Sequence, residues 1–221
     1  MTGEGIHLLF DTVFCKPVMK GNRCEAVIVE SKSGRMAYRA KMFVDSSGDA
    51  DLFFRAGERG VEEKNYLAYW FYRTDLKSMK KAVESGMVKD GISLEWRGRF
   101  LPDGSYNLGK KEYKGTNAKD IIRFVLDGRK ILREEIAKNR EENGALISLL
   151  GMAQYCRIRR IRGLYLLKEA DALKHFDDSV GCTGHWQKPG IVYEIPYRTL
   201  VTAQLTNLLA SDRVVSASED T

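Results

Sequence analysis

The sequence of 221 residues has few of the residues that mark exported or metal-binding proteins. Its four cysteines form no C-x-x-C pair, and together with three histidines they offer no second ligand pair of zinc spacing. We therefore expect reduced thiols and no metal site. The segment GCTGHW, which holds Cys182 and His185, leaves a zinc site as the less favoured alternative to a simple loop.

Long apolar stretches are also lacking. The chain has no run of about 18 apolar residues, the length needed to cross a bilayer. Its first residues, MTGEGIHLLFDT, have neither the basic region nor the long apolar region of a signal peptide. These absences predict a cytoplasmic protein with no membrane partner.

The net charge is positive, +6 at pH 7, which raises the question of a nucleic-acid partner. The basic residues are densest in KKEYKG, DGRKILREEIAKNREE and QYCRIRRIRG. The first two are typical of solvated loop and helix faces, and neither zinc-finger spacing nor an RNA-recognition signature accompanies them. We expect no nucleic-acid partner.

A strand-to-helix turn occupies residues 43–57, FVDSSGDADLFFRAG. An apolar strand end runs into Ser46, Ser47, Gly48 and Asp49, and a short helix follows. Either serine can act as N-cap by accepting from the first N–H groups of that helix. Two interpretations stay open: a capped turn, or a turn in which Gly48 lets the backbone approach a cofactor. The expected helix face and its end are Leu52, Phe53, Ala56 and Gly57.

The pattern elsewhere predicts an α+β fold. Residues 6–45 read as a three-stranded antiparallel meander with strands over 6–15, 24–31 and 36–45. The meander leads into the strand–turn–helix, and a mixed α/β region follows it. Within that region we expect a strand over 65–76 and a long helix over 119–143, begun by the capping pair Asn117 and Asp120.

Shorter elements are predicted around these. A helix follows the strand over 65–76, with Thr74 as N-cap and Gly86 at its end. Its expected apolar face is Leu76, Met79 and Val83. The further predictions are a strand pair over 93–113 turned at PDGS, a short helix over 168–176, an extended segment over 187–200, and two small strands around the polar turn in NLLASDRVVSAS.

Two motifs, taken with the order of the elements, resemble a known family. Residues 45–51 read DSSGDAD, close to the pattern D-A-T-G-D-x-D. Residues 193–200 read YEIPYRTL and residues 207–216 read NLLASDRVVS, close to Y-x-I-P-Y-R-x-L and N-L-L-x-A-G-R-x-I-S. In this order the motifs resemble the FAD-dependent oxidoreductases of the glutathione-reductase-like superfamily, in the group similar to fumarate-reductase flavoproteins.

The resemblance implies a partial FAD/NAD(P)-binding-type fold and an organisation in three parts. Residues 1–57 would hold the meander and part of the FAD-binding domain, residues 58–190 a substrate (cap) region, and residues 191–221 the return to the FAD-binding domain. The cofactor-binding residues implied by the matched motifs are Ser46, Ser47, Gly48, Asp49, Asp212, Arg213 and Ser216.

Two departures from the family pattern affect the cofactor. Asp212 stands where the pattern has a glycine, which would let the backbone approach the flavin. The phosphate-binding fingerprint G-x-G-x-x-G, whose helix N-terminus holds the pyrophosphate, does not occur in the chain. We therefore expect an internal fragment of a longer flavoprotein. Alone, it would not retain FAD, and self-association through a truncated surface stays open.

In such enzymes hydride passes between a small substrate and the flavin, and a basic side chain anchors a substrate anion. By the resemblance we favour Arg160 as the anchor. A solvated strand face, or an ion pair with Glu134 or Glu135, is the alternative for Arg160. His185 is the candidate proton donor, with a structural or exposed loop histidine as its alternative. The rival function is a non-catalytic binding module with a basic face.

Overall fold

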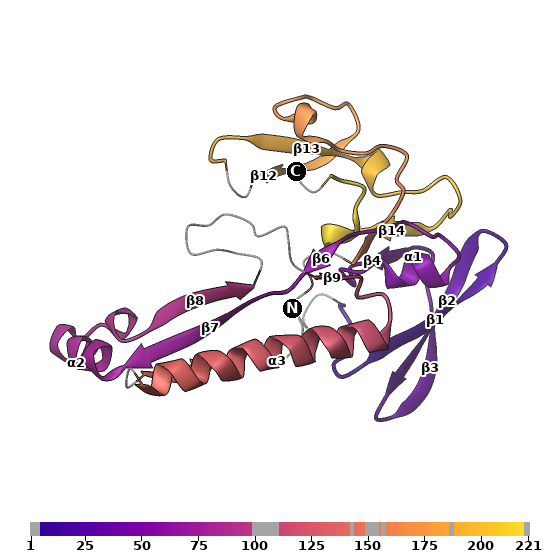
Figure 1. Cartoon of the computed structure of the whole chain (residues 1–221). Coiled ribbons are helices and arrows are strands. Elements are labelled where there is room, and N and C mark those ends of the chain that lie inside the picture. The colour runs from indigo at the N-terminus through magenta and orange to yellow at the C-terminus, as the bar shows by residue number, and fades with distance from the viewer. Residues whose placement is uncertain are drawn as a thin grey trace. The chain divides into compact units, whose positions relative to one another are not determined.

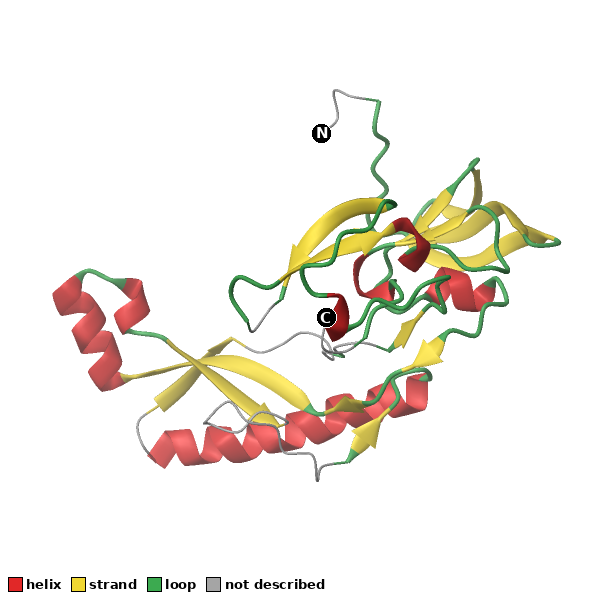
Figure 2. Cartoon of the chain, turned by 90° about the horizontal axis from the view of Figure 1, so that it is seen from above, coloured by secondary structure: helices red, strands yellow, loops and turns green. Residues whose placement is uncertain are grey.

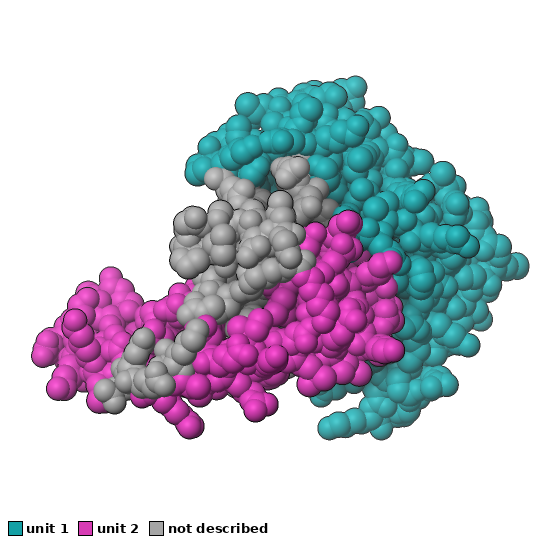
Figure 3. All heavy atoms as spheres, in the orientation of Figure 1, with its two compact units in different colours: residues 1–63, 159–221 teal, residues 64–158 magenta. Residues whose placement is uncertain are grey.

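The computed structural model describes residues 5–98, 111–141, 144–148, 155, 158–185 and 188–218. The chain divides into two compact units, shown in teal and magenta in Figure 3. Unit 1 comprises residues 1–63 and 159–221, and unit 2 comprises residues 64–158. Both units combine helices with small sheets, mostly antiparallel, which confirms the α+β class (Figure 2).

The first sheet of unit 1 is the expected antiparallel meander. It consists of β1 (Val13–Lys20), β2 (Arg23–Ser31) and β3 (Gly34–Arg39). The prediction of a first strand over 6–15 is wrong, because β1 starts at Val13, opposite Glu30 near the end of β2, and runs up to the turn after Lys20. The residues before Val13 lie beyond the reach of β2 and therefore have no strand to pair with.

The predicted third strand is in fact two strands in two sheets. β3 ends at Arg39, and β4 (Phe43–Asp45) pairs in parallel with β14 (Leu208–Ala210) from the other end of the chain. The helix α1 (Asp51–Arg55) follows β4 and buries Leu52 and Phe53, as expected. The core around this pair is Cys24, Phe43, Ala50, Leu52, Phe53, Ile161, Leu205, Leu208, Ala210 and Val214.

Asn207, the residue before β14, connects this pair to the meander. It is fully buried, and its side-chain Oδ1 accepts from the backbone N–H of Cys24 at 2.8 Å. Its Nδ2 donates to the carbonyl oxygens of Cys24 at 2.7 Å and Lys41 at 3.2 Å. Its own carbonyl accepts from the N–H of Phe43 at 3.0 Å. One amide thus satisfies backbone groups from two segments that are distant in sequence.

The remainder of unit 1 is made of short strands and 3₁₀ turns. β5 (Val61–Glu62) pairs with β11 (Arg159–Arg160), and β12 (Ser179–Gly184) pairs with β13 (Val192–Pro196). The 3₁₀ turns are η2 (Glu169–Asp171), η3 (Tyr197–Thr199) and η4 (Asp212–Val214). Pro196 is the last residue of its strand, as its missing N–H requires.

Two predictions fail in this part of unit 1. The helix expected over 168–176 is only the 3₁₀ turn η2, and Leu173 beyond it has a left-handed backbone with φ of 59°, which no helix continues. The second small strand of NLLASDRVVSAS is replaced by η4 and a single bridge between Ala217 and Leu167.

Unit 2 contains an antiparallel sheet and the long helix (Figure 1). The sheet has the order β10 (Gly144–Ser148), β7 (Ala68–Asp75), β8 (Ser93–Gly98), and α3 (Ala118–Glu141) is the helix. The short elements are β6 (Asn65–Tyr66), β9 (Glu112–Tyr113), α2 (Leu76–Ser85) and η1 (Val88–Asp90). The core is Leu67, Phe71, Tyr113, Phe124, Leu132, Tyr155 and Ile158.

The residues that cap the helices of unit 2 agree only in part with the predicted ones. Asn117 caps α3 as expected, with Oδ1 accepting from the N–H of Asp120 at 2.9 Å. Asp75, and not Thr74, caps α2, since its carboxylate accepts from the N–H of Ser78 at 2.7 Å. Thr74 instead donates its hydroxyl to the carbonyl of Gly91. Gly86 ends α2 with φ of 69°, as expected.

Pairing in unit 2 also differs from the expected strand pair over 93–113. β8 pairs with β7 and β9 pairs with β6, while the PDGS turn between them lies outside the described residues. The apolar face predicted for α2 is solvent-exposed in this chain, with Leu76 at 66% and Val83 at 81%. Every helix in the described part of the chain is too short or too polar to cross a membrane.

Candidate functional site

The site predicted from the motifs lies where the parallel strands β4 and β14 end (Figure 1). Leu208 faces Phe43 and Ala210 faces Asp45, so both strands finish at the same edge. The next N–H along β14, that of Ser211, donates to the carbonyl of Asp45 at 2.9 Å. Ligands of α/β proteins bind outside the carboxyl ends of parallel strands. The two motif segments, far apart in sequence, thus meet at such an edge.

The turn after β4 is organised by a buried carboxylate. Asp45 is only 3% exposed, and its Oδ1 accepts from the N–H of Ser47 at 3.0 Å. Its Oδ2 accepts from the N–H groups of Leu52 at 3.0 Å and Phe53 at 3.3 Å, in the first turn of α1. A carboxylate at a helix N-terminus is favoured by the helix dipole. Asp45 therefore satisfies the first N–H groups of α1, a role that the sequence analysis assigned to a serine.

Of the two serines proposed as N-cap, only Ser47 bonds to the helix start. Its hydroxyl accepts from the N–H groups of Asp49 at 3.3 Å and Asp51 at 3.2 Å. The residue in the N-cap position itself is Ala50, which has a left-handed backbone with φ of 55° and no side-chain cap. The N-cap role considered for Ser46 is wrong, since Ala50 stands in that position and the Ser46 hydroxyl makes no bond to the helix start.

Gly48 lies against a side chain from the other motif. Its φ is +79°, and a Cβ at this position would stand 2.7 Å from both Nε and Nη2 of Arg213. The Arg213 Nε donates to the carbonyl oxygen of Gly48 at 3.1 Å. Asp212, beside it, has φ of 59°, the region that favours glycine. The backbone at Asp212 thus has a conformation that glycine adopts freely, although the residue is an aspartate.

Arg159 holds the turn from a second side. Its side chain is 7% exposed, its Nε donates to the carbonyl of Asp49 at 3.1 Å, and its Nη2 pairs with the carboxylate of Asp51. The guanidinium also lies 4.1 Å from the centre of the Phe54 ring. Burial raises the pKa of Asp49, and the charges of Arg213 and Arg159 partly oppose this.

Sequence reasoning missed Arg159. Arg159 and Arg160 are neighbours on the short strand β11, so their side chains lie on opposite faces, and no local signal in the sequence showed which face met the turn. The structure shows that it is the face of Arg159. Arg160 instead pairs through Nε with Glu63 at 2.8 Å, inside unit 1, where the sequence analysis had named Glu134 or Glu135 as the alternative partner.

The other predicted site residues lie elsewhere in unit 1. His185 follows β12, and its Nδ1 accepts from the N–H of Lys188 at 3.2 Å, which leaves the proton of the neutral ring on Nε2. Ser216 is 2% exposed and packs where a Cβ on Gly163 would come within 2.7 Å of it. The structure therefore brings together the turn residues Ser46, Ser47, Gly48 and Asp49 with Asp212 and Arg213, and not with Arg160, His185 or Ser216.

Among the residues that the structure describes, no group of three His, Cys, Asp or Glu side chains could hold a metal ion. Searches of the curated proteins and of the solved structures found no match. A family model for FAD dependent oxidoreductases matches residues 1–62 and 58–221, which together cover the chain. The chain therefore belongs to the FAD dependent oxidoreductase family.

Proposed function

We propose that the protein transfers hydride between a small anionic substrate and FAD, and that the cofactor binds at the carboxyl ends of β4 and β14. One observation carries the proposal. The two motif segments meet at this edge, where Arg213 bonds to the carbonyl of Gly48. An edge of parallel strands built from a glycine turn and a cation is a suitable place for a nucleotide-containing cofactor.

The residues at this edge fit polar groups of FAD. Ser46, Ser47 and Arg213 are exposed, so two hydroxyls and a guanidinium face solvent beside the buried Gly48. Hydroxyls suit the sugar-like hydroxyls of the cofactor, and a guanidinium suits a phosphate. Gly48 has no side chain, so its backbone is open to close approach by the cofactor. Ser216, buried under Gly163, would act through backbone packing.

FAD, when bound, supplies the redox chemistry, and the chain supplies position and charge. In our proposal Arg160 anchors the substrate anion, with Glu63 orienting the guanidinium through Nε. His185 is the proton donor, through Nε2–H, since its Nδ1 accepts from Lys188. Arg159 and Asp45 position the turn and need not touch either ligand.

The 221-residue chain on its own is proposed not to retain FAD. The G-x-G-x-x-G turn that would bind the pyrophosphate does not occur in its sequence, so much of the binding free energy would have to come from another segment. The second candidate function is a non-catalytic binding module, which the net charge of +6 favours.

The experiment compares the 221-residue chain with the same chain extended by whatever the gene encodes in frame before Met1. Both are incubated with FAD and desalted, and bound flavin is read from visible absorbance. We expect flavin only in the extended protein, and about a tenfold weaker affinity in its Arg213→Gln variant than in the Arg162→Gln control, because a charge-assisted bond is lost.

Three outcomes would count against the proposal. An upstream region without a strand followed by G-x-G-x-x-G would favour the binding module. Stoichiometric FAD in the short chain would contradict the claim that it lacks essential contacts. Equal flavin affinity in the two arginine variants would remove Arg213, and with it the proposed edge, from the cofactor site.

A further inference from the structure

Unit 2 contains a hollow of about 340 Å³ beside the long helix. It is formed by α3, β9 and the residue before β7. Its lining residues are Leu67, Lys111, Tyr113, Asp127, Lys130, Ile131 and Glu134. Leu67 is 6% exposed and Tyr113 is 2% exposed, so buried apolar groups contribute to its wall. The volume lies in the range of small-molecule sites, roughly 300 to 1,000 Å³.

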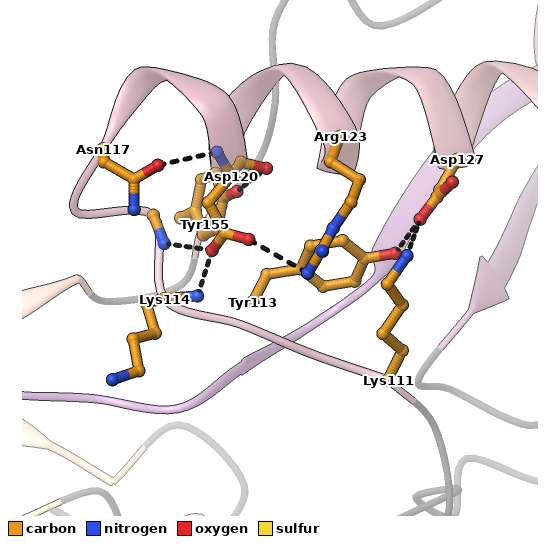
Figure 4. Close-up of polar contacts among 9 residues, drawn as sticks. Lys111, Tyr113, Lys114, Asn117, Asp120, Arg123, Asp127 and Tyr155 are labelled. Atoms are coloured by element: carbon orange, nitrogen blue, oxygen red, sulfur yellow. Dashed lines mark hydrogen bonds and ion pairs between the residues drawn. The ribbon is translucent and has the colours of Figure 1, made fainter.

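One side of the hollow is a closed hydrogen-bonded network. The Asp127 carboxylate accepts from Lys111 Nζ at 2.7 Å and from the Tyr113 hydroxyl at 2.5 Å (Figure 4). The bond from Lys111, with that from Tyr113, lowers the pKa of Asp127, and burial raises the pKa of Tyr113 above its usual range. Lys111 and Asp127 therefore neutralise each other, and the tyrosine ring is fixed in place.

Arg123, one turn before Asp127 on α3, also contacts Tyr113. Figure 4 shows Arg123 beside the Tyr113 ring, and its guanidinium lies 5.7 Å from the ring centre. Arg123 also pairs with Asp120 at 3.3 Å. Asp120 in turn accepts from the N–H of Gly115 at 3.1 Å. Asp127 thus holds the Tyr113 hydroxyl and Arg123 lies over the ring, so this wall of the hollow is preorganised for a ligand.

Two opposite charges remain on the lining. Lys130 and Glu134 are exposed, and neither forms an ion pair within the described part of the chain. They stand one turn apart on α3, with the lysine first, which is the less favourable order for a direct i, i+4 pair. Lys130 can therefore pair with an anionic group of a ligand, and Glu134 with a cationic group.

We propose that this hollow binds a small zwitterion with an apolar body, the chemistry of a free α-amino acid with a large apolar side chain. The carboxylate of the ligand pairs with Lys130 and its ammonium group pairs with Glu134. The apolar body lies on Leu67, Ile131 and the ring of Tyr113. The zwitterion matches the zero sum of the lining charges, which a simple anion or cation does not.

This inference does not rest on the proposed flavin site, since all of its residues belong to unit 2. The test titrates the 221-residue chain, without FAD, with three probes of equal ring size by calorimetry or ligand-observed NMR. The probes are L-phenylalanine, 3-phenylpropionate, which lacks the ammonium group, and phenethylamine, which lacks the carboxylate. We expect L-phenylalanine to bind about tenfold more tightly than either analogue, because each analogue leaves one charge unpaired.

Matched variants locate the site. Lys130→Gln should abolish the preference over phenethylamine, and Glu134→Gln should abolish the preference over 3-phenylpropionate. Arg133→Gln, an exposed change on the same helix that does not line the hollow, should leave all three affinities unchanged. All four proteins are checked for unchanged thermal unfolding first, so a misfolded variant is recognised and replaced by Lys130→Met or Glu134→Met.

Two results would overturn the proposal. One is equal binding of 3-phenylpropionate and L-phenylalanine, which would make the hollow a plain anion site. The other is no L-phenylalanine binding at millimolar concentration by the folded chain. Loss of FAD binding in the extended protein would leave this proposal untouched, so the two failures are distinguishable.

Discussion

Arg213 donates from Nε to the carbonyl oxygen of Gly48 at 3.1 Å, and so joins two turns that lie 165 residues apart. The bond holds the ends of β4 and β14 in contact beyond their last backbone pair. It also explains why residue 48 has no side chain, since a Cβ would occupy the space of the guanidinium. The closing contact of the candidate cofactor site is therefore made by residues of both motifs.

Gly48→Ala should destabilise the protein by about 2 to 3 kcal/mol. The alanine must adopt a φ of +79°, and its Cβ displaces Arg213 and breaks the bond to the carbonyl. The control is Gly34→Ala, at φ of +96° with nothing within 4 Å, which should cost only about 1 to 2 kcal/mol. The measurement is urea unfolding. Equal losses in the two variants would show that the Arg213 contact contributes nothing.

Asp212→Val should cost about 1 to 2 kcal/mol, whereas Asp212→Gly should be close to neutral. The backbone at this position is left-handed, which a β-branched residue adopts at a cost and a glycine adopts freely. Thermal unfolding of both variants gives the comparison. If valine were tolerated as well as glycine, the left-handed conformation at Asp212 would not be a requirement of the fold.

Arg159→Met should lower the free energy of unfolding by about 2 to 4 kcal/mol. The change removes the donor to the Asp49 carbonyl and leaves Asp51 without its partner. Arg162→Met is the control, because Arg162 is exposed and makes one bond to the carbonyl of Gly60, and we expect a loss below about 1 kcal/mol. A loss in Arg159→Met no larger than in the control would mean that the turn does not need this clamp.

His175 should titrate above the ordinary histidine pKa of about 6.5. Its Nδ1 lies 3.0 Å from Glu194 Oε1, and the hydrogen bond that Nδ1–H donates to that carboxylate raises the pKa of His175 while lowering the pKa of Glu194. The stabilisation from a raised pKa is fully present below about pH 6.5 and is lost as the pH rises through the folded value. It also fades at acid pH, as Glu194 becomes protonated.

NMR titration of the His175 ring measures this directly. Glu194→Gln should return the midpoint toward 6.5, because the partner charge is removed. Asp177→Asn should move it less, since the Asp177 carboxylate lies 3.8 Å from Nε2 and is fully exposed. An unshifted midpoint in the native protein would contradict the pairing.

Local signals predicted much of the fold and only part of the site. The turn at Gly21, the helix α3 with its cap Asn117 and the end of α2 at Gly86 follow from short sequence patterns. The pairing of β4 with β14 does not, because nothing in three residues encodes a partner more than 160 positions away. The motif resemblance assigned both segments to one FAD-binding domain and named most of the residues that meet there, but it did not predict that the two strands pair.

The misses share a physical cause. Asp45 ends a strand as predicted, but the sequence did not show that its side chain is buried and accepts from the first N–H groups of α1. The apolar residues of α2 have the predicted helical spacing, but spacing does not reveal whether a neighbour covers the face, and here the face is exposed. The direction of the Arg159 side chain depends on how β11 pairs with β5, and the sequence does not show that pairing.

The side chain of Asn207 bonds to Cys24, 183 residues earlier in the chain. During synthesis the ribosome releases Cys24 and β4 long before it reaches Asn207 and β14. The edge of β4 and the backbone groups of Cys24 therefore stay unpaired until Asn207 and β14 have been made. Contacts of this separation form slowly, and an open strand edge can meet a wrong partner first. Unit 2, residues 64–158, is translated between the two segments of unit 1. Its length therefore sets how long the edge of β4 stays unpaired during synthesis.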